Sequence, residues 1–349
     1  MQFSLSGRAS PRKRGVAPIM KRYLLSILAS TIAACSIIDD DLSVCGVDYE
    51  ISYEVRLVTD IDIVIENKLS SVADLPTANA LRTWLEPTFS GFAHDLDMLF
   101  YSWGEDDLRH SWHEIVDARS ASYTLYIPRE DYMHLAVVNT EDNPNVRMDG
   151  MNHAASLAIH QEKSDTLPTY NTAIYSARMP ITMSDSTILS YNVHLYMVTC
   201  AVALIVESDS VPATDMRVFL SGTASDFDIR DSLYTFAYSS LIRMDELSSR
   251  CYAVTAMPSP DAPAASMPAH LPTQKNAKSL WQLRAYTPLN NGTITETILD
   301  IDSPLRAGTL EIIRVKQLPD GSLEPVENSN VGVSVTLDWK DGGTHAIEL

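Results

Sequence analysis

Two segments, one near each end of the chain, alternate apolar and polar residues without a break. They are Tyr49–Leu57 and Val331–Lys340. Successive side chains of a β-strand point to opposite faces, so this two-residue period predicts strands with one face in a core and the other in water. Other segments are rich in β-branched and aromatic residues and are also predicted to be strands. They are Ser122–Ile127, Tyr132–Asn139, Asn192–Glu207, Met216–Leu220, Gln282–Tyr286, Thr293–Ile301 and Thr309–Lys316.

Turn-forming sequences separate these strand candidates, and helix signals are sparse. Asn290–Gly292 and Pro319–Gly321 are typical turn sequences. One helix is predicted over Pro76–Leu85, ending before Pro87, whereas the aromatic run Asp95–Trp103 favours a strand. Many strands with few helices indicate an all-β fold built of β-sandwiches.

The chain has 349 residues, enough for two domains of ordinary size. Leu195–Val206 is almost free of charge and too short to cross a bilayer, so it predicts a strand buried on both faces. We place a domain boundary just before it, near Ser190, which gives β-sandwich domains at 47–190 and 191–349. Met257–Pro272 holds five prolines and is predicted to be a long loop.

A basic head, a short apolar run and small residues precede Cys35 near the N-terminus. This layout is typical of a secretory signal peptide, and Ile32–Cys35 resembles a bacterial lipobox. We therefore expect residues 1–34 to be removed, with Met20 as the true start of translation, and Cys35 to be acylated. The alternative is an ordinary buried cysteine after a short helix. Several acyl chains, at about 0.8 kcal/mol per buried CH₂, would anchor the protein stably, whereas one chain would be marginal.

Residues 35–46 are expected to form a tether between the lipid and the folded body. They contain three consecutive aspartates, Asp39–Asp41. These could bind a metal ion, but a solvated acidic linker is favoured because no other ligand lies nearby in the sequence. Such acidic tethers look like the surface-export signals of Bacteroidales lipoproteins.

The chain carries 26 Lys and Arg residues against 45 Asp and Glu residues, a formal charge of −19. All six basic residues of the first 34 positions would leave with the signal peptide, which has no acidic residue, so the mature charge is −25. Such a charge repels phosphates, and nucleic acid is therefore not an expected partner. Hydrophobic residues make up 45% of the chain, which supports a packed core.

No sequence motif predicts catalysis, a metal or a cofactor. His110–Glu114 has histidines at i and i+3, which departs from the zinc-binding H-E-x-x-H pattern, so exposed polar residues are the favoured interpretation. Asp226–Asp228 and Asp300–Asp302 each place two carboxylates on one strand face, and solvated pairs are favoured over a calcium site. The sequence contains no nucleophile elbow, dinucleotide-binding or phosphate-loop motif. We expect no enzyme activity, no cofactor and no metal.

Three cysteines remain after lipidation: Cys45, Cys200 and Cys251. An odd number in an oxidising compartment leaves at least one free thiol. Cys200 is expected in the core, and Cys45 could bridge to Cys251, although nothing in the sequence requires it. The five tryptophans are scattered along the chain, which favours packing roles over a carbohydrate-binding platform.

The chain from Cys35 to Leu349 resembles the FimB-type fimbrial anchor lipoproteins of Bacteroidales. Asp39–Cys45 is similar to the start of the mature family members, except that Val44 stands where they usually have Asp. Val331–Gly343 is the most specific part of the resemblance. The other similar segments are Tyr132–Asn139, Asn291–Leu299 and Pro304–Leu310.

The resemblance implies two tandem transthyretin-like β-sandwich domains behind the lipidated tether. It implies a minor fimbrial subunit without catalytic residues, anchored in the outer membrane through Cys35 and exposed at the cell surface. Such a subunit attaches the fimbria, limits its length and binds the fimbrilin stalk by strand-edge pairing. The alternative is a surface glycan-binding lipoprotein of a nutrient-uptake system, which clustered exposed aromatics would favour. A secreted hydrolase, the third hypothesis, would need a pocket with converging carboxylates.

Overall fold

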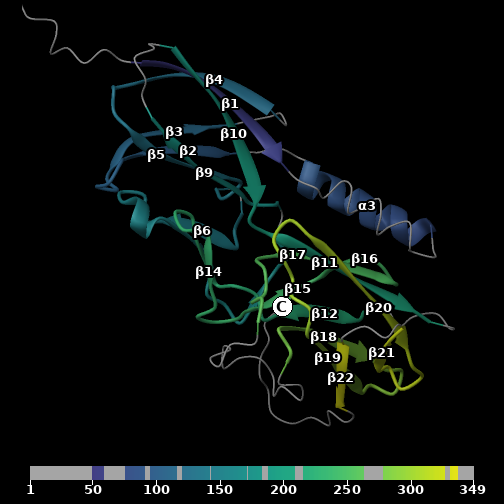
Figure 1. The fold of residues 1–349 in the computed structure, drawn as a ribbon. Coiled ribbons are helices and arrows are strands. Elements are labelled where there is room, and N and C mark those ends of the chain that lie inside the picture. Colours follow the sequence, from purple (N-terminus) through teal and green to yellow (C-terminus); the bar gives the residue numbers. More distant parts are fainter. Residues whose placement is uncertain are drawn as a thin grey trace, which may run out of the picture. The chain divides into compact units, whose positions relative to one another are not determined.

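The computed structural model describes residues 49–58, 75–90, 95–115, 120–141, 143–170, 172–182, 188–208, 215–262, 278–326 and 331–336. The described residues all belong to one compact unit, whose strands are drawn in Figure 1. The expected signal peptide, the tether with Cys35 and Cys45, and most of the proline-rich segment lie outside the described residues. The expectations for them stay predictions.

The described residues are mostly β-strands, and the predicted all-β sandwich class is confirmed. The helices are α3 (Leu75–Ser90) and the 3-10 helix η1 (Ala154–Ser156). The strands are β1 (Tyr49–Val58), β2 (Leu96–Ser102), β3 (Leu108–Glu114), β4 (Ser120–Ile127), β5 (Tyr132–Val138), β6 (Val146–Asp149), β7 (Ala158–Gln161), β8 (Thr166–Leu167), β9 (Tyr175–Ile181), β10 (Ile188–Met197), β11 (Cys200–Glu207), β12 (Arg217–Ser221), β13 (Asp226–Asp228), β14 (Leu233–Thr235), β15 (Leu241–Arg243), β16 (Asp245–Ser248), β17 (Cys251–Ala256), β18 (Trp281–Pro288), β19 (Ile294–Ile301), β20 (Leu310–Gln317), β21 (Leu323–Pro325) and β22 (Val331–Thr336).

The largest sheet has the strand order β3-β2-β5-β9-β10-β1-β4 and folds back on itself. In the described residues β9 and β10 share two residue pairs, far fewer than the neighbours on either side. β3 ends at Glu114 and β4 begins at Ser120. The chain between them reaches about 20 Å, whereas a flat seven-stranded sheet would hold these edges about 29 Å apart. The sheet therefore bends between β9 and β10, and β3-β2-β5-β9 faces β10-β1-β4 as a sandwich.

One apolar cluster fills the space between these two layers. Met98 of β2 and Val138 of β5 come from one layer, and Leu125 of β4 and Val193 of β10 come from the other. All four side chains are buried. Burial of one such side chain contributes about 1.5–3 kcal/mol to folding, so this cluster holds the layers together.

A second sandwich pairs the five-stranded sheet β16-β17-β11-β20-β21 with the six-stranded sheet β22-β19-β18-β12-β15-β8. Val202 and Leu204 of β11 belong to the same buried cluster as Leu283 of β18 and Leu299 of β19. The core of this sandwich therefore lies between β11 and the β18-β19 hairpin.

Helix α3 packs on the opposite face of the five-stranded sheet. It contacts β16 and β17. Its Leu81 and Leu85 are fully buried in one cluster with Ala203 of β11 and Cys251 of β17. β11 is consequently buried on both faces, as its almost uncharged sequence predicted.

The four-stranded sheet β14-β13-β7-β6 takes two strands from each half of the chain. β6 and β7 precede the predicted domain boundary near Ser190, and β13 and β14 follow it. β7 pairs antiparallel with β13, with His160 opposite Asp226, and β8 pairs parallel with β15. Backbone ladders thus join the two halves. The division at 190 and 191 stays a prediction, and β10 runs through that position.

Every strand candidate coincides with strand to within one residue over its described part, but Asn192–Glu207 is two strands instead of one. The break falls at Val198 and Thr199. Val198 N donates to Ile174 O (2.8 Å), and Gly308 N donates to Thr199 O (2.8 Å). These bonds tie the junction to other parts of the chain, because here the chain leaves the first sandwich and enters the second.

The prediction that the helix would end before Pro87 is wrong. α3 continues to Ser90 with Pro87 inside it. Proline has no N–H and so costs the helix one hydrogen bond. The Thr88 hydroxyl donates to the Trp84 carbonyl oxygen (2.9 Å), and the buried face of the helix packs on the sheet. Tertiary packing therefore outweighs the local signal for a helix end.

We predict that Ala203→Asp destabilises the protein by several kcal/mol. Ala203 is fully buried in β11, with Ala253 and Ile312 as its neighbours in the ladder. An unpaired carboxylate there would be desolvated, which costs about 3 kcal/mol or more. Urea unfolding followed by circular dichroism measures the change. Ala155→Asp, at an exposed alanine of η1, is the matched control and should shift stability by no more than about 0.5 kcal/mol. Equal stability of both variants would contradict the predicted burial.

Candidate functional site

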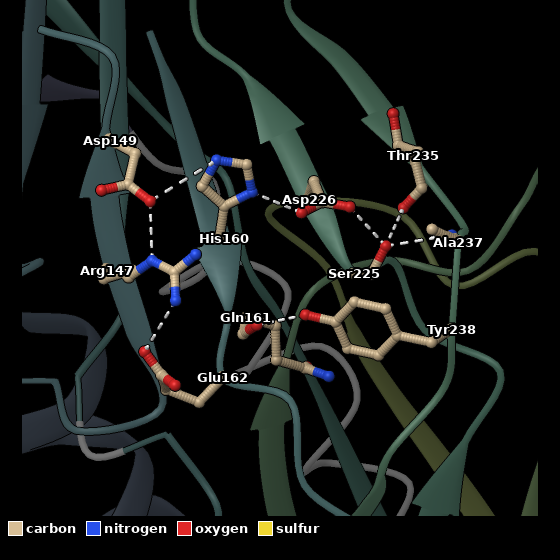
Figure 2. A network of polar contacts seen from close by, with 10 residues as sticks. All are labelled: Arg147, Asp149, His160, Gln161, Glu162, Ser225, Asp226, Thr235, Ala237 and Tyr238. Carbon is tan, nitrogen blue, oxygen red and sulfur yellow. Dashed lines mark hydrogen bonds and ion pairs between the residues drawn. The ribbon is translucent and has the colours of Figure 1, made fainter.

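A network of polar contacts lies on the shared four-stranded sheet (Figure 2). We call it the shared-sheet network. Its members are Arg147, Asp149, His160, Gln161, Glu162, Ser225, Asp226, Thr235, Ala237 and Tyr238. The strands β6, β7, β13 and β14 carry most of them side by side, so the network crosses from one half of the chain to the other.

Asp226 is the centre of the network. One of its oxygens lies 2.5 Å from His160 Nδ1, and the other accepts a hydrogen bond from the Ser225 hydroxyl at 2.5 Å. His160 Nε2 lies 4.0 Å from Asp149, which also pairs with Arg147 Nε at 2.7 Å. The Arg147 guanidinium holds the pKa of the Asp149 carboxyl below its ordinary value. A continuous chain of polar contacts therefore runs from β6 across β7 to β13.

A second set of contacts fastens the loop after β14. The Ala237 N–H donates to the Ser225 hydroxyl oxygen (3.0 Å), and the Tyr238 hydroxyl donates to the Gln161 carbonyl oxygen. Burial raises the pKa of Tyr238, so this hydroxyl keeps its proton at neutral pH. The loop from the second half is thereby attached to β7 from the first half.

The order of groups in the network does not support nucleophilic catalysis. Ser225 and His160 both bond to Asp226, and no hydrogen bond between Ser225 and His160 occurs among the described residues. A serine nucleophile needs histidine as its direct base, with the carboxylate behind the histidine. Here the carboxylate lies between them, which favours a structural role.

A second polar cluster is centred on His113 of β3, which belongs to the His110–Glu114 segment. His113 Nδ1 lies 3.0 Å from Asp97 and His113 Nε2 lies 3.1 Å from Glu141. The hydrogen bond with Asp97 raises the pKa of His113, whereas burial raises the pKa of Asp97. The segment is an edge strand with mostly exposed or half-buried polar residues, as predicted. The described residues contain no group of three or more His, Cys, Asp or Glu arranged to hold a metal ion.

The predicted solvated acidic pairs are wrong in two places. Asp300 is only 2% exposed and accepts a hydrogen bond from Gln282 Nε2 at 2.6 Å. It lies on β19, which has β18 on one side and β22 on the other. Asp226 is largely buried as well, with a side chain 20% exposed. Each carboxylate is hydrogen-bonded to a side chain of another strand, which sequence spacing did not indicate.

The two described cysteines are buried thiols. Burial raises the pKa of Cys251 to about 12 and raises the pKa of Cys200 further. A thiolate nucleophile is therefore unfavourable at either position. Cys200 lies in the core, as predicted. Cys35 and Cys45 lie outside the described residues. Acylation of Cys35 and a disulfide between Cys45 and Cys251 therefore stay predictions.

The exposed aromatic side chains do not gather on one surface. Tyr126 of β4 is level with Ile188 of β10 across β1, whereas Tyr196 lies eight residues further along β10. This spacing corresponds to about 26 Å of strand. Trp103 follows β2, three strands away from β10 in the sheet order. A carbohydrate platform of stacked aromatics is therefore absent from the described residues.

Two shallow pockets lie on the described surface. One of about 360 Å³ is lined by Tyr196, Phe227 and Tyr234 among others, without a carboxylate. The other, of about 580 Å³, contains Lys163, Tyr238 and the single carboxylate Asp165. Neither pocket has the converging carboxylates that a hydrolase would need.

Comparison with known proteins supports the fold. No protein-family model and no curated protein sequence matches the chain. A structure from Bacteroides thetaiotaomicron, described among "putative polysaccharide binding proteins", matches with a TM-score of 0.51 and 8% identity over 80% of this chain and 99% of that chain. The fimbrial anchor protein Mfa2 of Porphyromonas gingivalis matches with a TM-score of 0.45 and 12% identity, over 81% of this chain and 97% of its own. The tip fimbrial protein Mfa3 of the same organism gives 0.45 and 11%, over 84% and 100%.

The first of these matches shows that the chain shares its β-sandwich architecture with a solved Bacteroides protein over 80% of its length.

The network that joins the two halves was not predicted from the sequence. Its partners His160 and Asp226 are 66 residues apart, and only Asp226 had been singled out. No local pattern marks such a pair, because the sheet that brings them together is formed by distant segments.

We predict that Asp226→Ala lowers the free energy of unfolding by about 1–2 kcal/mol, because it leaves His160 without its partner on β13. Hydrogen exchange should show faster amide exchange in β7 and β13 than in β11. Asp228→Ala on the same strand is the control, since Asp228 accepts only from the nearby Asp231 N–H in the described contacts. If both variants loosen β7 to the same extent, the network does not join the halves.

We also predict a pH-dependent stabilisation from His113. Its pKa is raised above the ordinary 6.5 in the folded protein, so the stabilisation is complete below pH 6.5 and is lost as the pH rises through the folded pKa. The stability difference between the native protein and His113→Gln should therefore shrink as the pH rises from 6.5 through the folded pKa. It should stay below about 1 kcal/mol, because the pair is partly exposed.

Proposed function

We propose that this protein is a non-enzymatic minor fimbrial subunit, anchored by lipid in the outer membrane, that attaches the fimbria and limits its length. The observation that carries the proposal is the combination of a lipobox ending at Cys35 with an all-β double sandwich directly behind the tether. The sequence resemblance to FimB-type anchors supports the same function. Fimbrial proteins are also among the structures that the chain resembles.

The two halves of the chain are joined by several contacts, as a protein under tension would require. A fibre pulls one end of an anchor while the lipid holds the other, so the halves must not separate. The shared sheet and the salt bridge from Arg230 Nη1 to Asp106 (2.5 Å) join segments from both halves. The ladders between β7 and β13 and between β8 and β15 add backbone hydrogen bonds to the side-chain contacts between the halves.

Attachment to the membrane is assigned to Cys35. No helix of the described residues is long and apolar enough to span a bilayer. The acidic residues 35–46 would keep the body away from a negatively charged surface. We expect the protein to be exposed at the cell surface, to bind fimbrial subunits through a sheet edge, and to need no cofactor or nucleic acid.

A surface glycan-binding lipoprotein is the second candidate. The Bacteroides thetaiotaomicron structure with the same architecture carries a polysaccharide-binding description. The pocket of about 580 Å³ also offers a tyrosine ring, Tyr238, with the Lys163 ammonium 5.8 Å from its centre. The dispersed exposed aromatics weigh against this candidate.

Cys35→Ser separates the two candidates. The body should fold normally but lose its acyl chains, because the thiol that receives them is missing. For an anchor, fimbriae would be shed into the medium or grow without length control. For a glycan-uptake protein, growth on a polysaccharide would suffer and the fibres would be unaffected. Cell-bound and shed fimbriae are measured by electron microscopy and immunoblotting, with Cys200→Ser as the control. Normal attachment and length, with the lipid shown absent by mass spectrometry, would end the anchor proposal.

A further inference from the structure

The four sheets of the described residues end in eight edge strands, and most of them are unsuited to pairing. An open edge presents unpaired N–H and C=O groups, and proteins usually protect it with charges, proline, bulges or short length. Here β3 carries Arg109 and two histidines, and β6 carries Arg147 and Asp149. β16 has two acidic residues and an irregular register, and β21 ends in proline. β8 and β14 have two and three residues.

Two edges remain without such protection, β4 and β22. β22 is shorter, contains Gly332 and contacts β21 of the neighbouring sheet. β4 runs from Ser120 to Ile127 over eight residues and has no charged residue and no proline. It pairs along its whole length with β1 on one side, and no described strand pairs with its other side.

We propose that the open edge of β4 receives an extended strand of another fimbrial subunit. That the strand comes from a fimbrial subunit rests on the proposed function. That it pairs with β4 rests on the comparison of the edge strands. No described strand pairs with this eight-residue edge, and its outward backbone N–H and C=O groups are complementary to one kind of occupant, a β-strand.

The side chains of β4 specify the chemistry of this strand. Leu125 and Ile127 point into the core of the first sandwich and are 5% and 0% exposed. Thr124 and Tyr126 alternate with them on the outer face, and Tyr126 is 60% exposed. The added strand therefore carries apolar residues on the face level with Leu125 and Ile127, and hydroxyl or aromatic residues on the other.

Charge argues against a second copy of this chain as the occupant. Each mature copy would carry a formal charge of −25, so two copies repel one another at an edge that offers no compensating cation. The added strand is itself uncharged, because a charge opposite β4 would be desolvated without a partner.

The experiment uses the full-length lipoprotein in its native cells. A photo-crosslinking amino acid replaces Tyr126 in one strain and Tyr196 in another. Tyr196 is a matched control, since it is 63% exposed in the same sheet but lies on the interior strand β10. Mass spectrometry then identifies the crosslinked peptides. In parallel, the double variant Thr124→Lys with Tyr126→Lys is compared with Tyr196→Lys for cell-bound fimbriae, after circular dichroism has shown that both fold.

The proposal expects crosslinks from position 126 to one extended segment of a fimbrial subunit, and none to it from position 196. It also expects about a tenfold loss of cell-bound fimbriae in the double-lysine variant, equivalent to about 1.4 kcal/mol, with less than about a twofold change in the control. Crosslinks to a second copy of this chain, or none with fimbriae still attached, overturn the edge assignment. If the edge assignment is overturned but cells with Cys35→Ser still shed fimbriae, the anchor function is supported and only the role of β4 is wrong. Crosslinks to a non-fimbrial protein, with fimbriae unaffected by Cys35→Ser, overturn both.

Discussion

β11 is buried on both faces, and this double burial requires a packed layer on each side of the five-stranded sheet. Its ladders with β17 and β20 form the middle of the five-stranded sheet. Alternate residues face two different clusters: Val202 and Leu204 face the six-stranded sheet, while Ala201 and Ala203 face the side that α3 covers. Both faces are apolar, so the strand is stable only when the six-stranded sheet covers one face and α3 covers the other.

The shared sheet adds a second level of coupling. β7 and β13 come from different halves of the chain, and their ladder is reinforced by the contact between His160 and Asp226. The polar groups of the network satisfy one another across strands, which explains why a serine, an aspartate and a histidine can lie together without the order that catalysis needs. The cluster is best understood as a fastening between two sandwiches.

The edges of the sheets divide the surface into protected and open parts. Charges, short lengths or proline occur on most described edge strands, and β4 has none of these features. In a free-standing protein such an edge invites aggregation. In a subunit of an assembly the same edge is a place to pair, and the acidic body limits pairing between copies.

The sequence determined the fold class, because the two-residue period of Tyr49–Leu57 and the uncharged run of β11 are properties of neighbouring residues. Local patterns could not reveal the break at Val198 and Thr199 or the continuation of α3 through Pro87, since distant packing decides both. They also could not reveal the buried position of Asp300, whose partner Gln282 belongs to another strand. The acylation expected at Cys35 is inferred from the sequence alone. The pairing of the strands, and the edges that no described strand covers, depend on contacts between distant segments, because a strand's own residues specify its two faces but not its neighbours in the sheet.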